Sequence, residues 1–188
     1  ITISDEALDL GGEEFLDYIY DEITYQIAKK VQADLVSAIA ALGSAGATAV
    51  GVPAITASSI SVATVAEALG QLSDEAANPC VVMNKATWAA FKAAQYGANY
   101  AIDPFEGLPV YFDNTLPAFS SASANAVFMI VGDFGRGAQA NFPNGNEISI
   151  KFDDLSLAEK DLVKLVGREY VALGIVGDKC FCNVKKTS

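Results

Sequence analysis

The sequence of 188 residues contains no histidine. Histidine is the commonest general base in enzymes and the usual partner of a serine or cysteine nucleophile, so those catalytic pairs are missing. Its absence also removes every usual zinc site except one made entirely of cysteines. The sequence therefore disfavours the enzyme classes that depend on these sites, and we expect no catalytic, cofactor-binding or metal-binding residues.

Cysteine is scarce, with only Cys80, Cys180 and Cys182. An odd number of cysteines without a secretory segment indicates reduced thiols in a cytoplasmic setting. Cys180 and Cys182 lie two apart in a strand-like run, so we expect them on one face. Buried small side chains are the favoured interpretation, and a metal or redox role is the alternative.

Basic residues are also few. The 12 lysines and arginines stand against 23 acidic residues, which gives a net charge of -11. Without a basic cluster, such a chain lacks a general surface for nucleic acid. No apolar run is long enough to span a bilayer, and residues 122–131 contain Ser123 and Asn125 and are too short. We expect neither a specific nucleic acid nor a membrane as a partner.

What the sequence does contain is apolar periodicity, with 52% hydrophobic and 19% charged residues. Apolar side chains recur at steps of three and four along one predicted helix that begins after Gly12 and is capped by Gly43. They are Leu16, Ile19, Ile23, Ile27, Val31, Leu35, Ile39 and Leu42. Such a helix would be about 45 Å long, so we expect it to be the spine of an elongated molecule.

The rest of the chain alternates between short helices and strands. Residues 43–61 are predicted as a loop with at most a short strand, and Asn84 as the N-cap of a helix. Proline does not donate a backbone hydrogen bond, so Pro109 and Pro117 delimit a short strand between them. The predicted helices are 62–72 and 85–94, and the predicted strands are 80–83, 110–112, 127–131, 147–152, 162–176 and 180–184. This order favours an α+β fold.

Few residues suggest chemistry. Asp153 and Asp154 are adjacent carboxylates, but neighbours in a strand point to opposite faces, which favours a solvated loop. Asp133 and Arg136 lie in a glycine-rich turn that lacks the P-loop lysine and the dinucleotide spacing, so a tight turn with a local ion pair is favoured.

Two further pairs of side chains lie within the predicted helices and strands. Trp88 and Phe91 lie one helical turn apart, which favours packing in the core or at an interface over base stacking. Arg168 and Glu169 interrupt an apolar strand. In an assembly, this charged pair would meet partners on a neighbouring subunit.

Five motifs in order carry a resemblance over nearly the whole chain. They are Glu22–Lys30 in the long helix, Val82–Trp88, Gly107–Val110, Gly132–Phe134 and Arg168–Gly174. This set resembles the major capsid proteins of tailed phages with the Hong Kong 97 fold. The resemblance implies a peripheral domain of residues 1–44 and 147–168, and an axial domain of residues 45–146 and 169–188 with a mixed sheet.

The resemblance implies a structural subunit of an icosahedral phage or prophage head, which assembles into pentamers and hexamers. It implies copies of the chain as partners, together with scaffold, maturation protease and portal proteins. It also implies synthesis in the bacterial cytoplasm and a final place in the virion. Asp133, Arg136, Arg168 and Glu169 are the candidate residues for contacts between subunits.

The chain departs from the family in two respects. Family members carry an N-terminal arm and an extended loop before the spine helix, and we expect that both have been cut from this sequence. The fragment alone would then be a monomer or a weak oligomer. Some members form a lysine–asparagine cross-link, but the loop lysine is missing and Asp161 stands where asparagine is expected, so we do not predict cross-linking.

Three alternatives remain open. An encapsulin-like cargo shell shares the fold and would differ by binding cargo. A tail or head-completion protein would form rings of low copy number. A small hydrolase or ligand-binding domain would use Asp133, Arg136, Asp153 or Glu169, and a deep pocket lined by these side chains would support it.

Overall fold

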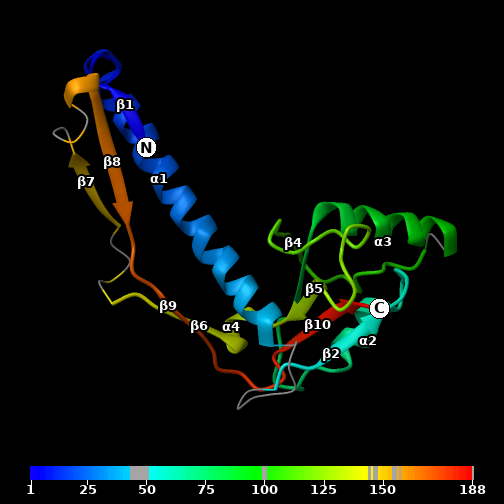
Figure 1. Ribbon diagram of the computed structural model, residues 1–188. Coiled ribbons are helices and arrows are strands. Elements are labelled where there is room, and N and C mark those ends of the chain that lie inside the picture. The colour runs from blue at the N-terminus through cyan, green and yellow to red at the C-terminus, as the bar shows by residue number, and fades with distance from the viewer. Residues whose placement is uncertain are drawn as a thin grey trace. The chain divides into compact units, whose positions relative to one another are not determined.

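The computed structural model describes residues 1–42, 51–98, 101–143, 145, 148–153, 156 and 158–187 (Figure 1). The chain divides into two compact units. Unit 1 comprises Ile1–Gln32 and Asn141–Ala172, and unit 2 comprises Ala33–Ala140 and Leu173–Ser188. Helix α1 (Asp5–Leu42) supplies residues to both.

In unit 1, α1 packs on one face of an antiparallel sheet, and β8 runs alongside the helix (Figure 1). The sheet has the order β1–β8–β7, formed by β1 (Thr2–Ser4), β8 (Leu162–Arg168) and β7 (Ser149–Asp153). A short 3-10 helix, η1 (Ala158–Lys160), precedes β8. The buried side chains of this unit's core are Ile19, Ile23, Val163 and Leu165.

The alternation of β8 explains how the helix and the sheet fit together. Val163 and Leu165 are buried, whereas Lys164 and Arg168 on the opposite face are exposed. A Cβ atom at Gly167 would lie only 2.3 Å from the Cγ2 atom of Ile23. Glycine at this position therefore allows the helix to approach the sheet closely.

The long helix was predicted correctly in its periodicity and in the break at Gly12. Gly12 has φ 62° and ψ −165°, so two helical segments meet there at a kink, and the first of them, which begins at Asp5, was not predicted. Glycine adopts this conformation because it lacks a Cβ atom. The predicted C-cap, Gly43, lies outside the described residues.

Unit 2 is built on a five-stranded mixed sheet. Its strands, in spatial order, are β2 (Ala54–Ala57), β10 (Phe181–Lys186), β5 (Val127–Gly132), β3 (Cys80–Met83) and β4 (Val110–Phe112). The two edge pairs, β2–β10 and β3–β4, are parallel, and the central pairs are antiparallel. The mixed sheet and the α+β class agree with the prediction.

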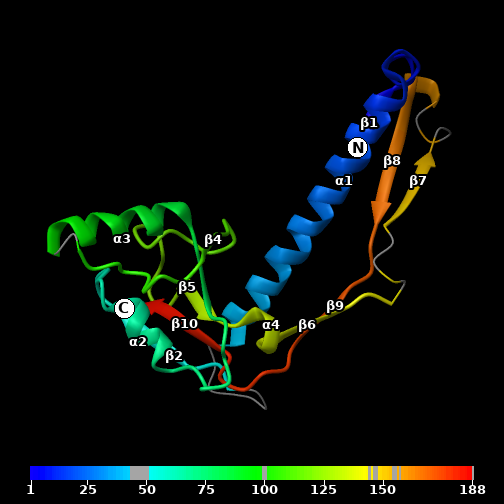
Figure 2. The ribbon, with the colours of Figure 1, turned by 180° about the vertical axis from the view of Figure 1, so that it is seen from behind.

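Apolar side chains cover both faces of this sheet. Helices α2 (Thr64–Leu69) and α3 (Lys85–Ala98), which lie beside the sheet in Figure 2, contribute Val65 and Phe91 to one core cluster. The last turns of α1 contribute Val36 and Ile39 to a second cluster. Strand β5 is buried along its whole length, as its continuous apolar sequence predicted.

A bulge in β5 changes its alternation. Val184 lies opposite Met129, but the next residue, Lys185, lies opposite Val127, so Phe128 is the extra residue. Phe128 therefore joins Met129 in the first cluster, and Val127 joins the second. The bulge places a large ring against the first cluster, where it meets Phe119 at a centroid distance of 4.9 Å.

The last described turn of α1 is held by a buried side chain of the sheet. The amide nitrogen Nδ2 of Asn183 donates to the carbonyl oxygens of Ile39, at 2.9 Å, and Ala40, at 3.4 Å. Carbonyl groups in the last turn of a helix have no partner within the helix. Asn183 thus joins the helix end to the centre of the sheet.

Several expected elements differ in length or are additional. The predicted strand 162–176 is two strands, β8 and β9 (Ala172–Ile175), because residues 169–171 leave the extended ladder. Strand β9 pairs with β6 (Ala138–Asn141), which was not predicted, and neither were β1 and α4 (Phe134–Gly137). Helix α2 is shorter than predicted, and α3 extends to Ala98.

The predicted peripheral and axial domains stay a prediction. Their boundaries at 44/45 and 146/147 fall on residues outside those described. Cys180 and Cys182 were expected on one face, but Cys180 precedes β10 and joins the second core cluster, whereas Cys182 joins the first.

Candidate functional site

Asp133 is buried, with 3% of its surface exposed, and its carboxylate organises a turn. It is the N-cap of α4 and accepts hydrogen bonds from the backbone N–H groups of Gly135 and Arg136. A third N–H, that of Asn78, donates to its other oxygen at 3.0 Å. These bonds occupy the carboxylate within the turn, where N-capping is stabilising.

Arg136 lies on the surface and pairs with a different acid from the one expected. Its guanidinium group is 3.0 Å from a carboxylate oxygen of Glu75, and both side chains are more than half exposed. An exposed pair of this kind contributes little to stability. The local ion pair predicted for this turn therefore forms, but with Glu75 in place of Asp133.

The glycines of this turn have a packing role. A Cβ atom at Gly132 would lie 2.4 Å from the carbonyl oxygen of Cys180, and one at Gly137 would lie 2.4 Å from the ring of Phe181. The ring of Phe134 also meets that of Phe181, at a centroid distance of 5.0 Å. Close approach to β10 thus explains the glycine-rich sequence without a phosphate ligand.

Of the two adjacent carboxylates considered in the sequence, Asp154 lies outside the described residues. Asp153 ends β7 and accepts hydrogen bonds from the backbone N–H and the hydroxyl group of Ser156. Its carboxylate is therefore occupied by hydrogen bonds to Ser156.

Arg168 and Glu169 occupy the end of β8 in different environments. Arg168 is exposed. Both carboxylate oxygens of Glu169 are buried, and they accept no hydrogen bond from any residue that the structure describes. Burial of a carboxylate without a hydrogen-bond partner costs free energy. A hydrogen-bond donor from outside the described residues would remove this cost.

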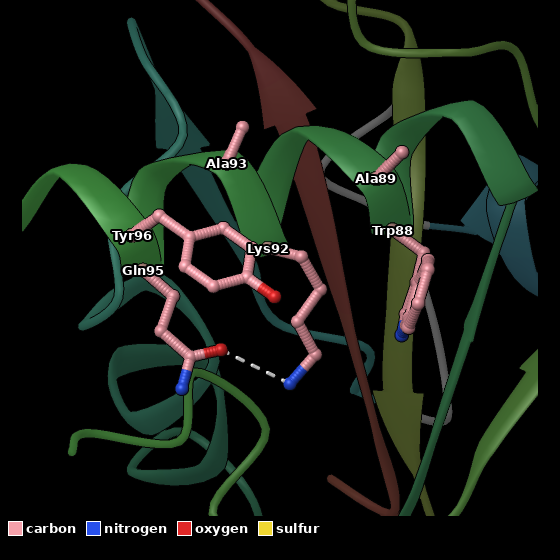
Figure 3. A pocket seen from close by; sticks show the side chains of 6 residues that line it. All are labelled: Trp88, Ala89, Lys92, Ala93, Gln95 and Tyr96. Atoms are coloured by element: carbon pink, nitrogen blue, oxygen red, sulfur yellow. Dashed lines mark hydrogen bonds between the residues drawn. The ribbon is translucent and has the colours of Figure 1, made fainter. Parts of the chain in front are cut away.

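A depression lies on the surface of α3 (Figure 3). It has a volume of about 540 Å³ and is lined by Trp88, Ala89, Lys92, Ala93, Gln95 and Tyr96. Lys92 donates to Gln95 at 3.1 Å and pairs with Asp103 at 3.3 Å. The N–H of Gly107 and, to a smaller degree, Lys92 lower the pKa of Asp103.

This depression offers no acid, base or nucleophile arranged around a substrate. All its lining residues come from one helix, and Lys92 is held by its neighbours. A second depression, between the end of α1 and residues 115–127, has mostly small and apolar walls. Neither is lined by Asp133, Arg136, Asp153 or Glu169, so neither supports the hydrolase alternative.

The three thiols are free and buried. Burial raises the pKa of Cys80 and of Cys182 from 9.0 to about 11, and Asp133 contributes at Cys80. Such thiols are poor nucleophiles because the thiolate is the reactive form. Within the described part of the chain, no three histidine, cysteine or acidic side chains are grouped to hold a metal ion. No helix there is long and apolar enough to cross a membrane.

The sequence analysis missed the surface residues of unit 1. Tyr18 and Tyr25 of α1 are 65% and 58% exposed. Lys151 is exposed on the face of the sheet opposite the helix. The signal for the tyrosines was present, because they are seven residues apart, on the helix face opposite the apolar stripe.

Comparison with known proteins gives one family and one fold. The model of the phage capsid family matches residues 1–186. No curated protein is similar enough to the chain to count as a match. The three solved structures described next are 13% to 18% identical to this chain, so their similarity indicates a shared fold.

Three of these structures represent different particles. The capsid of an empty GTA particle computed with C5 symmetry has a TM-score of 0.77 at 18% identity, covering 100% of this chain and 70% of that one. Gordonia phage Cozz has a TM-score of 0.60 at 13% identity, and the match covers 100% of this chain and 68% of that one. The holo-SrpI encapsulin complex from Synechococcus elongatus PCC 7942 has a TM-score of 0.64 at 13% identity, and the match covers 98% of this chain and 71% of that one.

Proposed function

Because the chain belongs to the phage capsid family, we propose that it assembles with copies of itself into pentamers and hexamers of an icosahedral head. It is a structural subunit of a phage head shell, and its fold is that of the Hong Kong 97-like capsids. The match of the family model to residues 1–186 is the observation that carries this proposal. Closed symmetry allows many weak contacts between identical subunits to add up to a stable shell.

Arg168 and Glu169 are proposed contacts between subunits. The exposed guanidinium group of Arg168 is available to a carboxylate of another copy. The buried oxygens of Glu169 lack a donor among the described residues, and an N–H or cationic group of a neighbouring copy would supply one. Assembly would thus satisfy a group that the single chain leaves unpaired.

The Glu169→Gln variant tests this contact. Glutamine removes the charge, so it should stabilise the unassembled subunit, where the buried charge is unpaired. It should destabilise the shell, because it leaves the partner group on the neighbouring copy without its counter-charge. The midpoints of subunit unfolding and of shell dissociation in denaturant measure the two effects. The exposed Glu159 provides the control, Glu159→Gln, which should change neither. Equal shifts of both midpoints in the same direction would refute the contact.

Asp133 and Arg136 are proposed contacts of a different kind. Since the Asp133 carboxylate is occupied by three backbone N–H groups, it would act by holding the turn that presents Arg136. The guanidinium group of Arg136 would then pair with a carboxylate of the neighbouring copy, either in place of Glu75 or in addition to it.

Further aspects of the proposal follow from family membership. We propose that the chain catalyses no reaction, that it is made in the bacterial cytoplasm and that its final place is the virion. Scaffold, maturation protease and portal proteins are proposed partners. The proposed peripheral domain comprises residues 1–44 and 147–168, and the proposed axial domain comprises the remainder.

Electron microscopy of the full-length gene product that contains this chain is the test. Produced together with the other head proteins of its genome, it should form closed icosahedral particles whose reconstruction shows five-fold and six-fold clusters. Rings of fixed low copy number, or a protein that stays monomeric under all these conditions, would refute the proposal.

A cargo-filled shell is the second candidate, and the similarity to the fold of the SrpI encapsulin complex favours it over unrelated functions. Particles formed in the absence of any other head protein, and purified with a defined enzyme inside, would support this candidate. Particles that enclose DNA would support the phage head.

A further inference from the structure

The helix face of unit 1 that points away from its sheet carries acidic and aromatic side chains. Glu14, Tyr18, Asp21 and Tyr25 follow one another at steps of four, three and four, and Asp17 lies beside them. All five are exposed. We call these five residues the acidic ridge. Lys29, whose ammonium group is 6.0 Å from the ring centroid of Tyr25, lies at its C-terminal end.

The opposite face of the same unit is basic. Lys151 lies across from Val166, and Arg168 lies across from Ser149, all on the side of the sheet turned away from α1. Lys164 shares this side, and it lies across from Asp153. We call Lys151, Lys164 and Arg168 the basic face. The three cations are exposed and make no ion pair with any residue that the structure describes.

These two surfaces match in length and in chemistry. From Glu14 to Tyr25 the ridge measures about 16 Å at ~1.5 Å per helical residue. From Lys164 to Arg168 the strand measures about 13 Å at ~3.3 Å per residue. Carboxylates pair with lysine and arginine, and the faces of tyrosine rings attract the same cations. Tyrosine and arginine are also the residues that most often anchor interfaces.

We infer that the acidic ridge of one copy docks on the basic face of a neighbouring copy. The inference rests on the proposed function, because it requires a shell made of copies of this chain. The contact is heterologous, since it joins two different surfaces, and repetition of such a contact around an axis closes a ring.

The charges of the two surfaces favour a second copy of the chain, rather than DNA, as their binding partner. Two chains that each carry a net charge of -11 repel at long range, so their orientation on approach depends on the few surfaces where cations are exposed. A polyanion such as DNA would be attracted to the basic face but repelled by the acidic ridge of the same unit. A neighbouring copy satisfies both surfaces at once.

Reversal of charge on each surface tests the contact. One variant carries Asp17→Lys and Asp21→Lys, a second carries Lys151→Glu and Arg168→Glu, and a third carries all four changes. In the full-length gene product, each of the first two should reduce the yield of closed particles at least about tenfold, because like charges would then face each other. The third variant should recover the yield of the parent protein, because opposite charges face each other again and its net charge is unchanged.

A matched control carries Lys85→Glu and Lys179→Glu, two exposed lysines of unit 2, and has the same net charge as the basic-face variant. Its yield should exceed that of the basic-face variant. Circular dichroism and thermal unfolding of the four variants check that each subunit folds. The loss in the acidic-ridge variant should also be smaller at high salt, which screens surface charges.

The outcomes separate the two proposals. If the parent protein forms no closed particle, the proposed function fails. If the parent assembles and either two-residue variant assembles equally well, the shell remains but this contact is refuted. A four-residue variant that folds and still does not assemble also refutes the contact. Recovery in that variant supports it, since no effect confined to one surface would be reversed by changes on the other.

Discussion

Unit 2 and unit 1 bury their side chains in different ways. Unit 2 surrounds a five-stranded sheet with apolar clusters on both faces, and its central strand β5 is buried throughout. Unit 1 has one layer of buried side chains between a helix and three strands. Its remaining faces carry exposed charges and the tyrosines Tyr18 and Tyr25.

This difference suggests a separate role for each unit, one in the stability of the subunit and one in contacts with other subunits. A core covered on both faces provides stability within one chain. A single layer leaves two outer surfaces free for contacts with other molecules. In our account, unit 2 therefore provides most of the stability of the folded subunit, and unit 1 supplies the acidic ridge and the basic face, which other copies cover.

The largest expected effect is in unit 2. Phe128 is fully buried and meets the ring of Phe119. Phe128→Ala removes a large side chain and leaves a cavity between the sheet and its helices, so it should lower the free energy of unfolding by about 3–5 kcal/mol. Urea unfolding followed by fluorescence measures the change. A loss below about 1 kcal/mol would show that this core is not closely packed.

The equivalent change in unit 1 should be smaller. Leu165→Ala removes a buried side chain from the core of that unit. We expect a loss of about 2–3 kcal/mol, because a single thin layer can collapse partly into the space. Hydrogen exchange should show faster exchange in β8 and β7, with little change in β5. Equal acceleration in β5 would mean that the two units unfold together.

Asn183 tests how unit 2 holds the end of α1. Asn183→Ala removes the donor to the carbonyl oxygens of Ile39 and Ala40 and leaves these buried groups with less hydrogen bonding. The expected loss is about 1–3 kcal/mol. Exchange of the amides in the last turns of α1 should increase in parallel. Unchanged stability would indicate that water replaces the side chain.

At neutral pH the smallest effect is that of the buried thiols, because they change stability only in alkaline solution. The pKa of Cys80 and of Cys182 is raised to about 11 in the folded chain, from 9.0 in the unfolded chain. Between these values the unfolded state has lost protons that the folded state retains, so stability should fall as the pH rises from 9 to 11. Below pH 9 the thiols should cause no change with pH.

The double variant Cys80→Ala and Cys182→Ala separates the thiols from the lysines and tyrosines that titrate in the same range. Urea midpoints between pH 8.5 and 10.5 should fall less steeply in this variant than in the parent. Parallel curves for the two proteins would contradict the effect of the buried thiols.

The elements that sequence predicted best have strong local signals. The long helix follows from apolar side chains repeated over its length, and the N-cap of α3 is confirmed, because Ala86 N–H donates to the Oδ1 atom of Asn84 at 2.9 Å. Strand β4 lies between the two prolines as predicted. In each case neighbouring residues determine the conformation.

The elements that were missed depend on distant residues. Strand β1 has only three residues and exists because it pairs with β8, more than 150 positions away in sequence. Arg168 and Glu169 visibly interrupt the apolar pattern, but nothing in the local sequence shows that residues 169–171 leave the ladder. The acidic ridge and the basic face have no shared motif, since only the fold of unit 1 places them on opposite sides of one layer.

Hydroxyl-radical footprinting of Tyr18 and Tyr25, in the free subunit and in closed particles, is the most direct test of the contact surfaces on unit 1. Both rings are exposed in the single chain and should be oxidised readily there. The account predicts that assembly protects both tyrosines strongly, because the acidic ridge is covered by the basic face of a neighbour. Equal oxidation of both rings in subunits and particles would contradict it.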